Sequence, residues 1–158
     1  MTNRRQFLRG LGMASLAATS LGSLPGCITG AVGGSGSLSE LSVAEIQRRM
    51  AAGSLTAERL TDHFLQRIHR LDRNGPRLNS VIELNPEAVA MARALDAERR
   101  TRGPRGPLHG LPVLIKDNID TGDRMQTTAG SLALAGSTAP KDAFILTRLR
   151  AAGAVVLG

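Results

Sequence analysis

The sequence contains little of what disulfide frameworks and aromatic binding surfaces require. Its one cysteine, Cys27, excludes an intramolecular disulfide. Three phenylalanines and no tyrosine or tryptophan leave no stacking platform for single-stranded nucleic acid. Lysine is scarce as well, because every basic residue except Lys116 and Lys141 is an arginine. A preference for arginine over lysine more often reflects the base composition of the gene than a surface that binds nucleic acid. A basic nucleic-acid-binding protein is therefore the weakest functional hypothesis, and we expect no nucleic-acid partner.

Two arginines, Arg4 and Arg5, stand near the N-terminus and are followed by a phenylalanine and a leucine. The next stretch, 10–24, is moderately apolar, but it is too short and too rich in Gly, Ser and Thr for a spanning helix. This layout predicts a twin-arginine signal peptide over residues 1–27, with Arg4 and Arg5 read by the twin-arginine translocase. We therefore expect an exported protein of the periplasm or cell envelope. Cleavage of the signal peptide would also remove Arg4, Arg5 and Arg9, which contribute to the net charge of +7.

Cys27 stands where a lipoprotein signal peptide would be cleaved, directly after a glycine. Lipid attachment there would tether the mature protein to a membrane surface. Pro25 departs from the usual lipobox pattern, and ordinary cleavage within 29–31 is the alternative that would discard the cysteine. The Gly/Ser-rich segment 28–37 is predicted to be a flexible linker in either case.

Two helices are predicted in the first half of the folded part. Ser42 and Glu45 form a capping-box pattern at the start of the first helix, and Gly53 is suited to end it. Thr56 can cap a second helix that stops at Asn74. Its apolar stripe, at helical spacing, consists of Leu60, Phe64, Leu65, Ile68 and Leu71.

Strands and helices alternate in the second half. The apolar segment 78–84, the run that ends at Lys116 and the segment 154–157 are predicted strands. Asn85 is expected to cap a helix that ends before a glycine at 103, and Asp142 to cap the helix before the last strand. This alternation predicts an α/β fold.

The three histidines do not form a recognisable ligand set. His63 and His69 lie on the second helix without acidic or cysteine partners at metal-ligand spacing, so we expect no metal site and no cofactor. His109 lies in a Gly/Pro-rich connection and is expected to serve the turn.

Lys116 ends a short apolar run, 113–115, just before a polar turn. Burying an ammonium costs free energy and drives the group towards its neutral form. A neutral amine accepts protons, so a buried lysine at this place would suit a general base. The alternative is a strand-end lysine whose ammonium reaches solvent.

Three separated segments, 106–120, 127–131 and 149–158, together resemble the amidase signature family. The segments 82–86 and 105–110 are most similar to its bacterial peptide-amidase branch. The resemblance covers nearly all of the chain after Leu38 and implies that 38–158 is the N-terminal part of an amidase domain. Such a domain has a mixed central sheet covered by helices.

The resemblance also implies roles for single residues. Lys116 would be the lysine of a Ser–Ser–Lys triad, in which it deprotonates a bridging serine that activates a nucleophilic serine. Gly130 and Ser131 would lie in a substrate-side wall near Lys116, and the alternative is that 127–131 is a plain connector. Independently of the resemblance, the side chains of Asp117 and Asn118 are expected to hold the turn after the lysine by hydrogen bonds to backbone groups.

The two triad serines lie in a Gly/Ser-rich loop downstream of the lysine in the family, and residues 117–158 contain no such loop. We therefore expect a truncated amidase domain, and the bare apolar segment 154–157 at the end points the same way. The first functional hypothesis is an exported amidase that hydrolyses a small amide or a peptide C-terminal amide. The alternative is a catalytically inactive, truncated amidase-like lipoprotein.

Overall fold

The computed structural model describes residues 37–158 of the chain. The predictions for Arg4, Arg5 and Cys27 lie outside these residues. The helices are α1 (Val43–Ala51), α2 (Ala57–Arg67), α3 (Ala88–Arg102) and α4 (Phe144–Ala151), and the strands are β1 (Pro112–Val113) and β2 (Val155–Val156). Short 3-10 helices lie at η1 (Leu38–Glu40) and η3 (Leu132–Leu134), and the π-helix η2 (Ile68–Asn74) continues α2. None of the helices within 37–158 is both long and apolar enough to cross a membrane.

The first two helices begin where their capping residues predict. The hydroxyl of Ser42 accepts the N–H of Glu45 at 3.2 Å, and that of Thr56 accepts the N–H of Arg59 at 3.1 Å. Each bond satisfies one of the N–H groups that a helix start leaves without a partner. Gly53 follows α1 with a φ of +69°, as a helix-ending glycine does.

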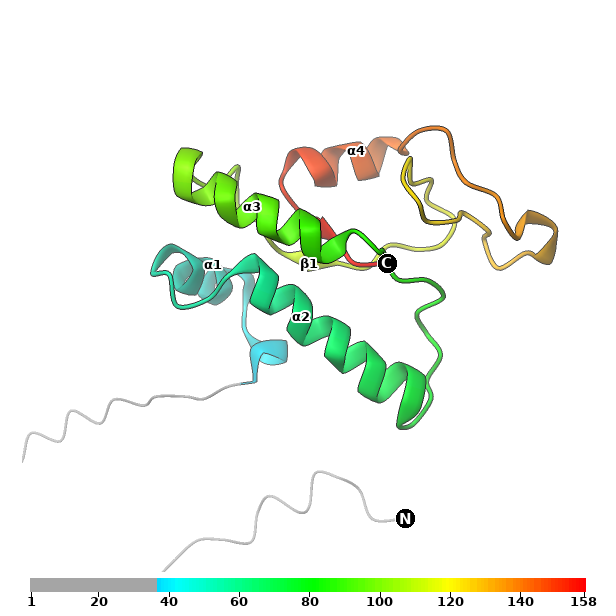
Figure 1. Ribbon diagram of the computed structural model, residues 1–158, viewed down its shortest axis with the longest axis horizontal. Helices are drawn as coiled ribbons and strands as arrows, with labels where there is room; N and C mark the ends of the chain where they lie inside the picture. Colours follow the sequence, from blue (N-terminus) through cyan, green and yellow to red (C-terminus); the bar gives the residue numbers. More distant parts are fainter. Residues whose placement is uncertain (1–36) are drawn as a thin grey trace, which may run out of the picture. The chain divides into compact units, whose positions relative to one another are not determined.

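The two strands pair in parallel, with Pro112 opposite Val155 and Val113 opposite Val156. Alternate residues of β2 face opposite sides of this small sheet. Val155 and Leu157 pack in a core built with α1, α2 and α3, whereas Val156 packs with Leu146 of α4. Figure 1 shows α4 on one side of the strands and α2 on the other. Helices cover both faces, so the predicted α/β class is confirmed.

The apolar stripe of the second helix does not run straight to its end. Leu60 and Ile68 are buried, but Leu71 is 37% exposed and Asp72 is only 4% exposed. The reason is the change from an α-helix to a π-helix at Ile68, which rotates the following residues relative to the α-helical stripe. A charged side chain therefore turns inward where an apolar one was expected.

The prediction of a strand over 78–84 is wrong for the described structure. The N–H groups of Ser80 and Val81 donate to the carboxylate of Asp72, at 2.7 and 3.2 Å, instead of to a neighbouring strand. Arg77 and Asn79 also have positive φ values, +55° and +50°, which interrupt an extended backbone. The segment is held by a side chain rather than by a strand ladder.

Two predicted helix caps have other partners. Asn85 accepts the N–H of Glu87 at 2.9 Å, but α3 begins only at Ala88. Its amide also donates to the carbonyl of Val156 at 2.8 Å, so it connects the start of α3 to β2. Asp142 does not cap α4, which starts after Ala143.

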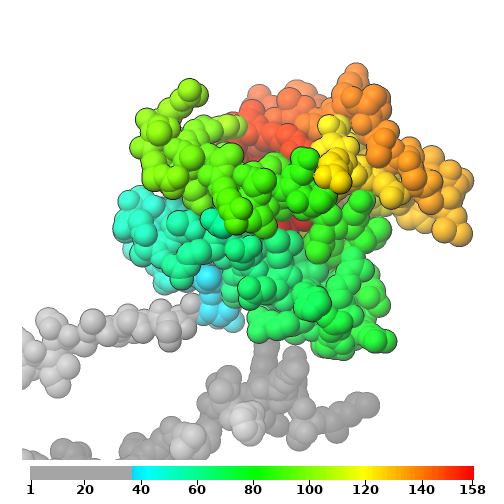
Figure 2. All heavy atoms as spheres, in the orientation of Figure 1, coloured from blue at the N-terminus to red at the C-terminus, as the bar shows by residue number. Residues whose placement is uncertain are grey.

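The loop 125–140 projects from the side of the described body, as Figure 2 shows in yellow and orange. Most of its residues are exposed. Near its two ends, the N–H of Thr127 donates to the carbonyl of Ser137 at 3.0 Å. The first part of this loop reaches back towards the residues that follow β1.

Candidate active site around Lys116

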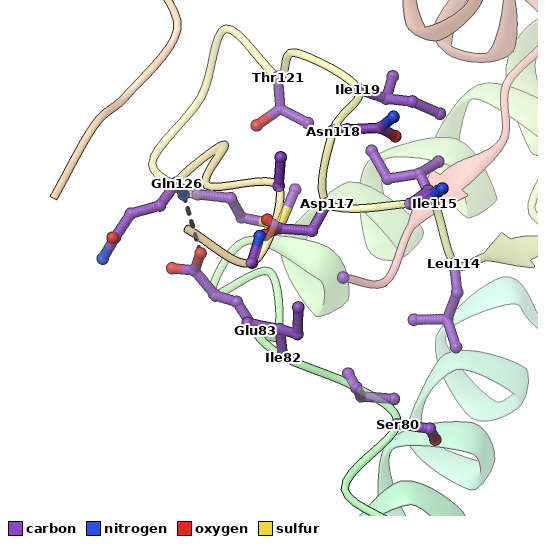
Figure 3. A pocket seen from close by; sticks show the side chains of 16 residues that line it. Ser80, Ile82, Glu83, Leu114, Ile115, Asp117, Asn118, Ile119, Thr121 and Gln126 are labelled. Atoms are coloured by element: carbon purple, nitrogen blue, oxygen red, sulfur yellow. Dashed lines mark hydrogen bonds between the residues drawn. The ribbon is translucent and has the colours of Figure 1, made fainter. Parts of the chain in front are cut away.

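A cavity of about 360 Å³ lies beside the residues that follow β1. Its walls come from segments that are far apart in the sequence (Figure 3). Its apolar lining residues are Val81, Ile82, Leu114, Ile115, Ile119, Met125 and Ala129, and its polar ones include Ser80, Glu83, Lys116, Asp117, Asn118, Thr121 and Gln126. Most of the surface that these walls expose to the cavity is apolar, with polar groups between the apolar ones, which is typical of small-molecule sites.

Lys116 lines this cavity, but it lies beyond the paired part of β1. The parallel pairing continues to the N–H of Ile115, which donates to the carbonyl of Gly158 at 3.1 Å. Lys116 itself is exposed. The expectation of a buried lysine is therefore not met within 37–158, because these residues leave its side of the cavity open to solvent.

Asp117 directs its carboxylate away from the lysine's own turn and towards the loop 128–130. It accepts the hydroxyl of Thr128 in a short hydrogen bond and the N–H of Gly130 at 3.3 Å. Its backbone carbonyl accepts the N–H of Ala129 at 3.0 Å. The Thr128 hydroxyl, followed by these backbone N–H groups, lowers the pKa of the Asp117 carboxyl below its usual value. Asp117 therefore stays ionised at neutral pH and holds a second loop against the cavity.

Of the two loop residues named with the lysine, Gly130 lines the cavity and Ser131 does not. The N–H of Ser131 donates to the carbonyl of Thr128 at 2.8 Å, which closes the turn upon itself. Ser131 is exposed and directly precedes η3. Ser80 does line the cavity, but its hydroxyl donates to Asp72 at 2.5 Å.

Two further polar residues, which the sequence analysis did not predict as site residues, line the cavity. Glu83 accepts the backbone N–H of Gln126 at 2.8 Å, drawn as a dashed line in Figure 3, and so connects two walls. Thr121 is 2% exposed, and its hydroxyl has no hydrogen-bond partner among residues 37–158. No local pattern marks either residue, because each acquires its neighbours from a distant segment.

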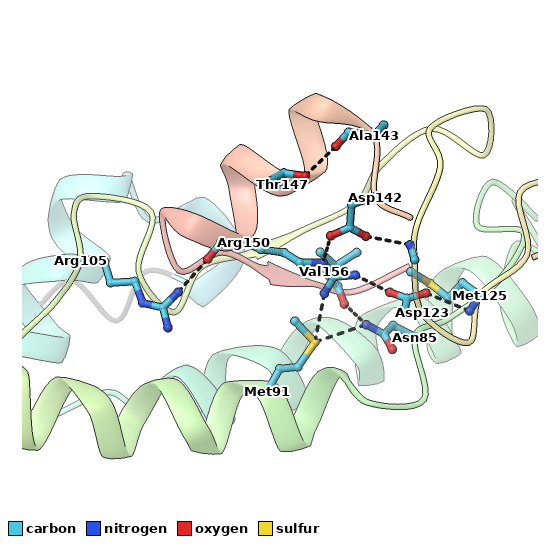
Figure 4. A network of polar contacts seen from close by, with 11 residues as sticks. Asn85, Met91, Arg105, Asp123, Met125, Asp142, Ala143, Thr147, Arg150 and Val156 are labelled. Carbon is cyan, nitrogen blue, oxygen red and sulfur yellow. Dashed lines mark hydrogen bonds and ion pairs between the residues drawn. The ribbon is translucent and has the colours of Figure 1, made fainter. Parts of the chain in front are cut away.

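A partly buried ion network supports the wall that contains Met125 (Figure 4). The guanidinium of Arg150 donates to Asp142 at 2.9 Å and to Asp123 at 2.5 Å. The carboxylate of Asp142 accepts the N–H of Gly122 at 2.7 Å, and that of Asp123 accepts the N–H of Met125 at 2.9 Å. Arg150 thus fixes the 122–125 loop to α4, and Asp142 has this role in place of the predicted cap.

The histidines have structural contacts. His109 is fully buried, with its Nδ1 accepting the N–H of Arg105 at 3.2 Å and its Nε2 donating to the carbonyl of Leu95 at 2.9 Å. These two contacts connect the ring to the turn at Arg105 and to α3, so His109 serves the turn as predicted. His63 contacts the hydroxyl of Ser39 at 3.0 Å. Within 37–158, no three His, Cys, Asp or Glu side chains are grouped as a metal site would require.

Comparison with known proteins identifies relatives over this same region. The model of the Amidase family matches residues 59–158. An amidase-type protein of Schizosaccharomyces pombe is 41% identical over 121 residues, which are 77% of this chain and 20% of that protein. One glutamyl-tRNA(Gln) amidotransferase subunit, from Chloroflexus aurantiacus, is 43% identical over 122 residues, which are 77% of this chain and 24% of its own length.

Comparison with solved structures identifies amidases as well. The native peptide amidase of Stenotrophomonas maltophilia superposes with a TM-score of 0.72 at 57% identity, over 75% of this chain and 24% of that one. The chain thus spans about a quarter of the length of these relatives, and its fold matches the N-terminal part of theirs. A family model that covers most of the folded residues, together with this structural agreement, shows that the chain belongs to the amidase signature family.

Proposed function

We propose that this chain is the front part of an amidase that hydrolyses carboxamides, with a peptide C-terminal amide as the preferred class of substrate. The observation that supports the proposal is the position of Lys116, at the edge of a cavity of about 360 Å³ with largely apolar walls. This cavity lies in the region that is 57% identical to a peptide amidase.

In the proposed reaction Lys116 is the terminal base of a Ser–Ser–Lys relay. Its neutral amine takes the proton of a bridging serine, which takes the proton of the nucleophilic serine as that oxygen attacks the amide carbon. The C–N bond then breaks, the released amine or ammonia takes up a proton, and water hydrolyses the acyl-enzyme. Both serines would come from sequence outside these 158 residues. A segment that covers Lys116 would also provide the burial that favours its neutral form.

The experiment is to express the longest open reading frame that contains this chain and to assay amide hydrolysis. Lys116→Ala and Lys116→Met are expected to lower kcat by about 10²–10⁴-fold, or more if the relay acts as a unit. Lys141→Ala is the matched control, because it removes the other, exposed lysine. Activity of Lys116→Ala within a few-fold of wild type would remove the lysine from the mechanism.

The alternative is a catalytically inactive, amidase-like lipoprotein in which Lys116 has no catalytic role. The specific observation in its favour is that Lys116 is exposed within the described residues 37–158, whereas a general base of this kind would be buried. We expect the purified 158-residue chain to hydrolyse no amide and to be poorly soluble. Amide turnover by a mass-verified preparation of this chain alone would contradict the need for further serines.

We also propose that the protein is exported through the twin-arginine route and anchored by a lipid at Cys27. The support is the order of the N-terminal residues, in which the arginine pair, the moderately apolar stretch and the cysteine follow one another. The protein would then act on amides in the periplasm or cell envelope.

A further inference from the structure

The turn 128–130, which is hydrogen-bonded to the residue after Lys116, has an unusual backbone. Ala129 has a φ of +50°, in the left-handed region that residues with a Cβ rarely enter, and Gly130 follows with a φ of +73°. Both residues line the cavity. A non-glycine residue in this conformation persists only where surrounding contacts hold it, and such residues cluster at functional sites.

The contacts that hold this turn come from the residue next to Lys116. Asp117 binds on both sides of Ala129, through the hydroxyl of Thr128 and the N–H of Gly130. Its own carbonyl accepts the N–H of Ala129 at 3.0 Å. The hydroxyl of Thr128 also accepts the N–H of Gly130 at 3.1 Å, so all these groups form one unit.

This unit joins two segments that are 11 to 13 residues apart. Because Asp117 follows Lys116 directly in the chain, any shift of the turn is transmitted to the backbone that bears the lysine. The N–H groups of Ala129 and Gly130 are both used within the unit. The turn therefore offers a bound molecule a shaped wall rather than free donors.

We propose that Asp117 is a positioning residue, which clamps the 128–130 turn against the cavity and fixes its distance from the amine of Lys116. A substrate amide would be held between this wall and the lysine. Precise placement of reacting groups is worth orders of magnitude in rate, so a loose wall lowers kcat even when the substrate still binds. This inference rests on the proposed amidase function.

The test compares Asp117 with a carboxylate that makes similar bonds elsewhere. Asp96 also accepts two backbone N–H groups, but it does not line the cavity. In the protein from the longest open reading frame, Asp117→Asn and Asp117→Ala are expected to lower kcat by at least 10-fold, with KM within 3-fold. Asp96→Asn is expected to lower Tm with kcat within 2-fold.

Thr128 gives a second, independent pair of variants. Thr128→Val removes the hydroxyl bonded to Asp117 and is expected to lower kcat about 10-fold, whereas Thr128→Ser keeps the hydroxyl and should recover most of that loss. Hydrogen exchange of the Thr128–Gly130 amides should be faster in Asp117→Ala and Thr128→Val. This measurement reports on the clamp without any assay of activity.

The outcomes separate the two proposals. If the wild-type protein hydrolyses no amide, the proposed function fails, while exchange rates that do not change in Asp117→Ala would overturn the clamp by themselves. If the wild type is active and Asp117→Ala keeps its kcat per folded molecule, the positioning role is overturned. If circular dichroism shows a smaller folded fraction of Asp117→Ala, its kcat is calculated per folded molecule. The kcat of the milder variant Asp117→Asn then decides whether Asp117 has the positioning role.

Discussion

Asp96 of α3 caps the first turn of α2, where its Oδ1 accepts the N–H of Ala57 at 2.8 Å. Its Oδ2 accepts the N–H of the next residue, Glu58, at 3.0 Å. These groups belong to the four N–H groups that a helix start leaves unsatisfied, and a carboxylate there also meets the positive end of the helix dipole. The bond spans 39 residues of sequence and joins the two longest helices.

We expect Asp96→Asn to destabilise the protein by about 1–2 kcal/mol, because asparagine has one acceptor oxygen for two N–H groups and lacks the charge. Urea denaturation at neutral pH measures the change. Asp62→Asn is the matched control, since Asp62 lies on α2 itself and its carboxylate has no hydrogen bond or ion pair with the residues described. An equal loss of stability in both variants would show that the cap contributes nothing specific.

The second prediction concerns the stability of the protein at acidic pH. The hydroxyl of Ser80, with the N–H groups of Ser80 and Val81, lowers the pKa of Asp72 below its ordinary value of 3.8. The unfolded chain therefore binds this proton more readily, so the stabilisation is present above about pH 4 and is lost as the pH falls through the lowered pKa.

Denaturation curves between pH 7 and pH 3 test this sign. The stability of the wild-type protein should fall towards the acid end, and the fall should be smaller in Asp72→Asn, which has no carboxyl to protonate. Ser80→Ala should also reduce it, because it removes the largest cause of the lowered pKa. The assignment to Asp72 would be wrong if all three curves had the same slope.

The third prediction compares two glycines with positive φ. A Cβ at Gly153 (φ +80°) would lie 2.8 Å from Nδ1 of the buried His109, whereas a Cβ at Gly53 (φ +69°) would meet nothing within 4 Å. Gly53→Ala should cost about 1 kcal/mol, the backbone penalty alone. Gly153→Ala should cost about 3 kcal/mol, because overpacking is added to the same penalty.

Thermal denaturation of the two alanine variants measures this difference. A further variant, His109→Ala with Gly153→Ala, should recover part of the overpacking cost if the imidazole is the obstacle. Equal Tm values for Gly53→Ala and Gly153→Ala would show that the ring yields freely.

The last prediction concerns the N-terminus. Arg4→Lys together with Arg5→Lys should leave precursor in the cytoplasm, since the arginine pair is the address that the translocase reads. Arg9→Lys is the control outside the pair. Cell fractionation followed by immunoblotting measures the distribution.

Lipid attachment is a separate step of the same prediction. Cys27→Ala should move the mature protein from the membrane pellet to the soluble fraction or stall its processing, because the anchor needs the thiol. A soluble wild-type product whose N-terminus lies beyond Cys27, found by mass analysis, would exclude the anchor and leave the export prediction intact.

The features that the sequence determined by itself are local ones. Ser42 and Thr56 start their helices as predicted, because a capping hydroxyl and the N–H that it binds are three residues apart. The strand β2 (Val155–Val156) and Leu157 after it are buried as predicted, because a run without polar residues can be covered on both faces. The family, too, was indicated by short motifs around Lys116.

Only the tertiary structure decided what the carboxylates do. Asp72, Asp96, Asp117 and Asp142 accept backbone N–H groups 8, 39, 13 and 20 residues away, and only Asp142 was expected to cap a helix. The segment 78–84 depends on Asp72 in the same way, and the exposure of Lys116 depends on which segments reach it. An ionised carboxylate accepts hydrogen bonds from the donors that the folded chain brings near it. When those donors belong to a distant segment, the spacing of residues in the sequence does not predict which ones they are.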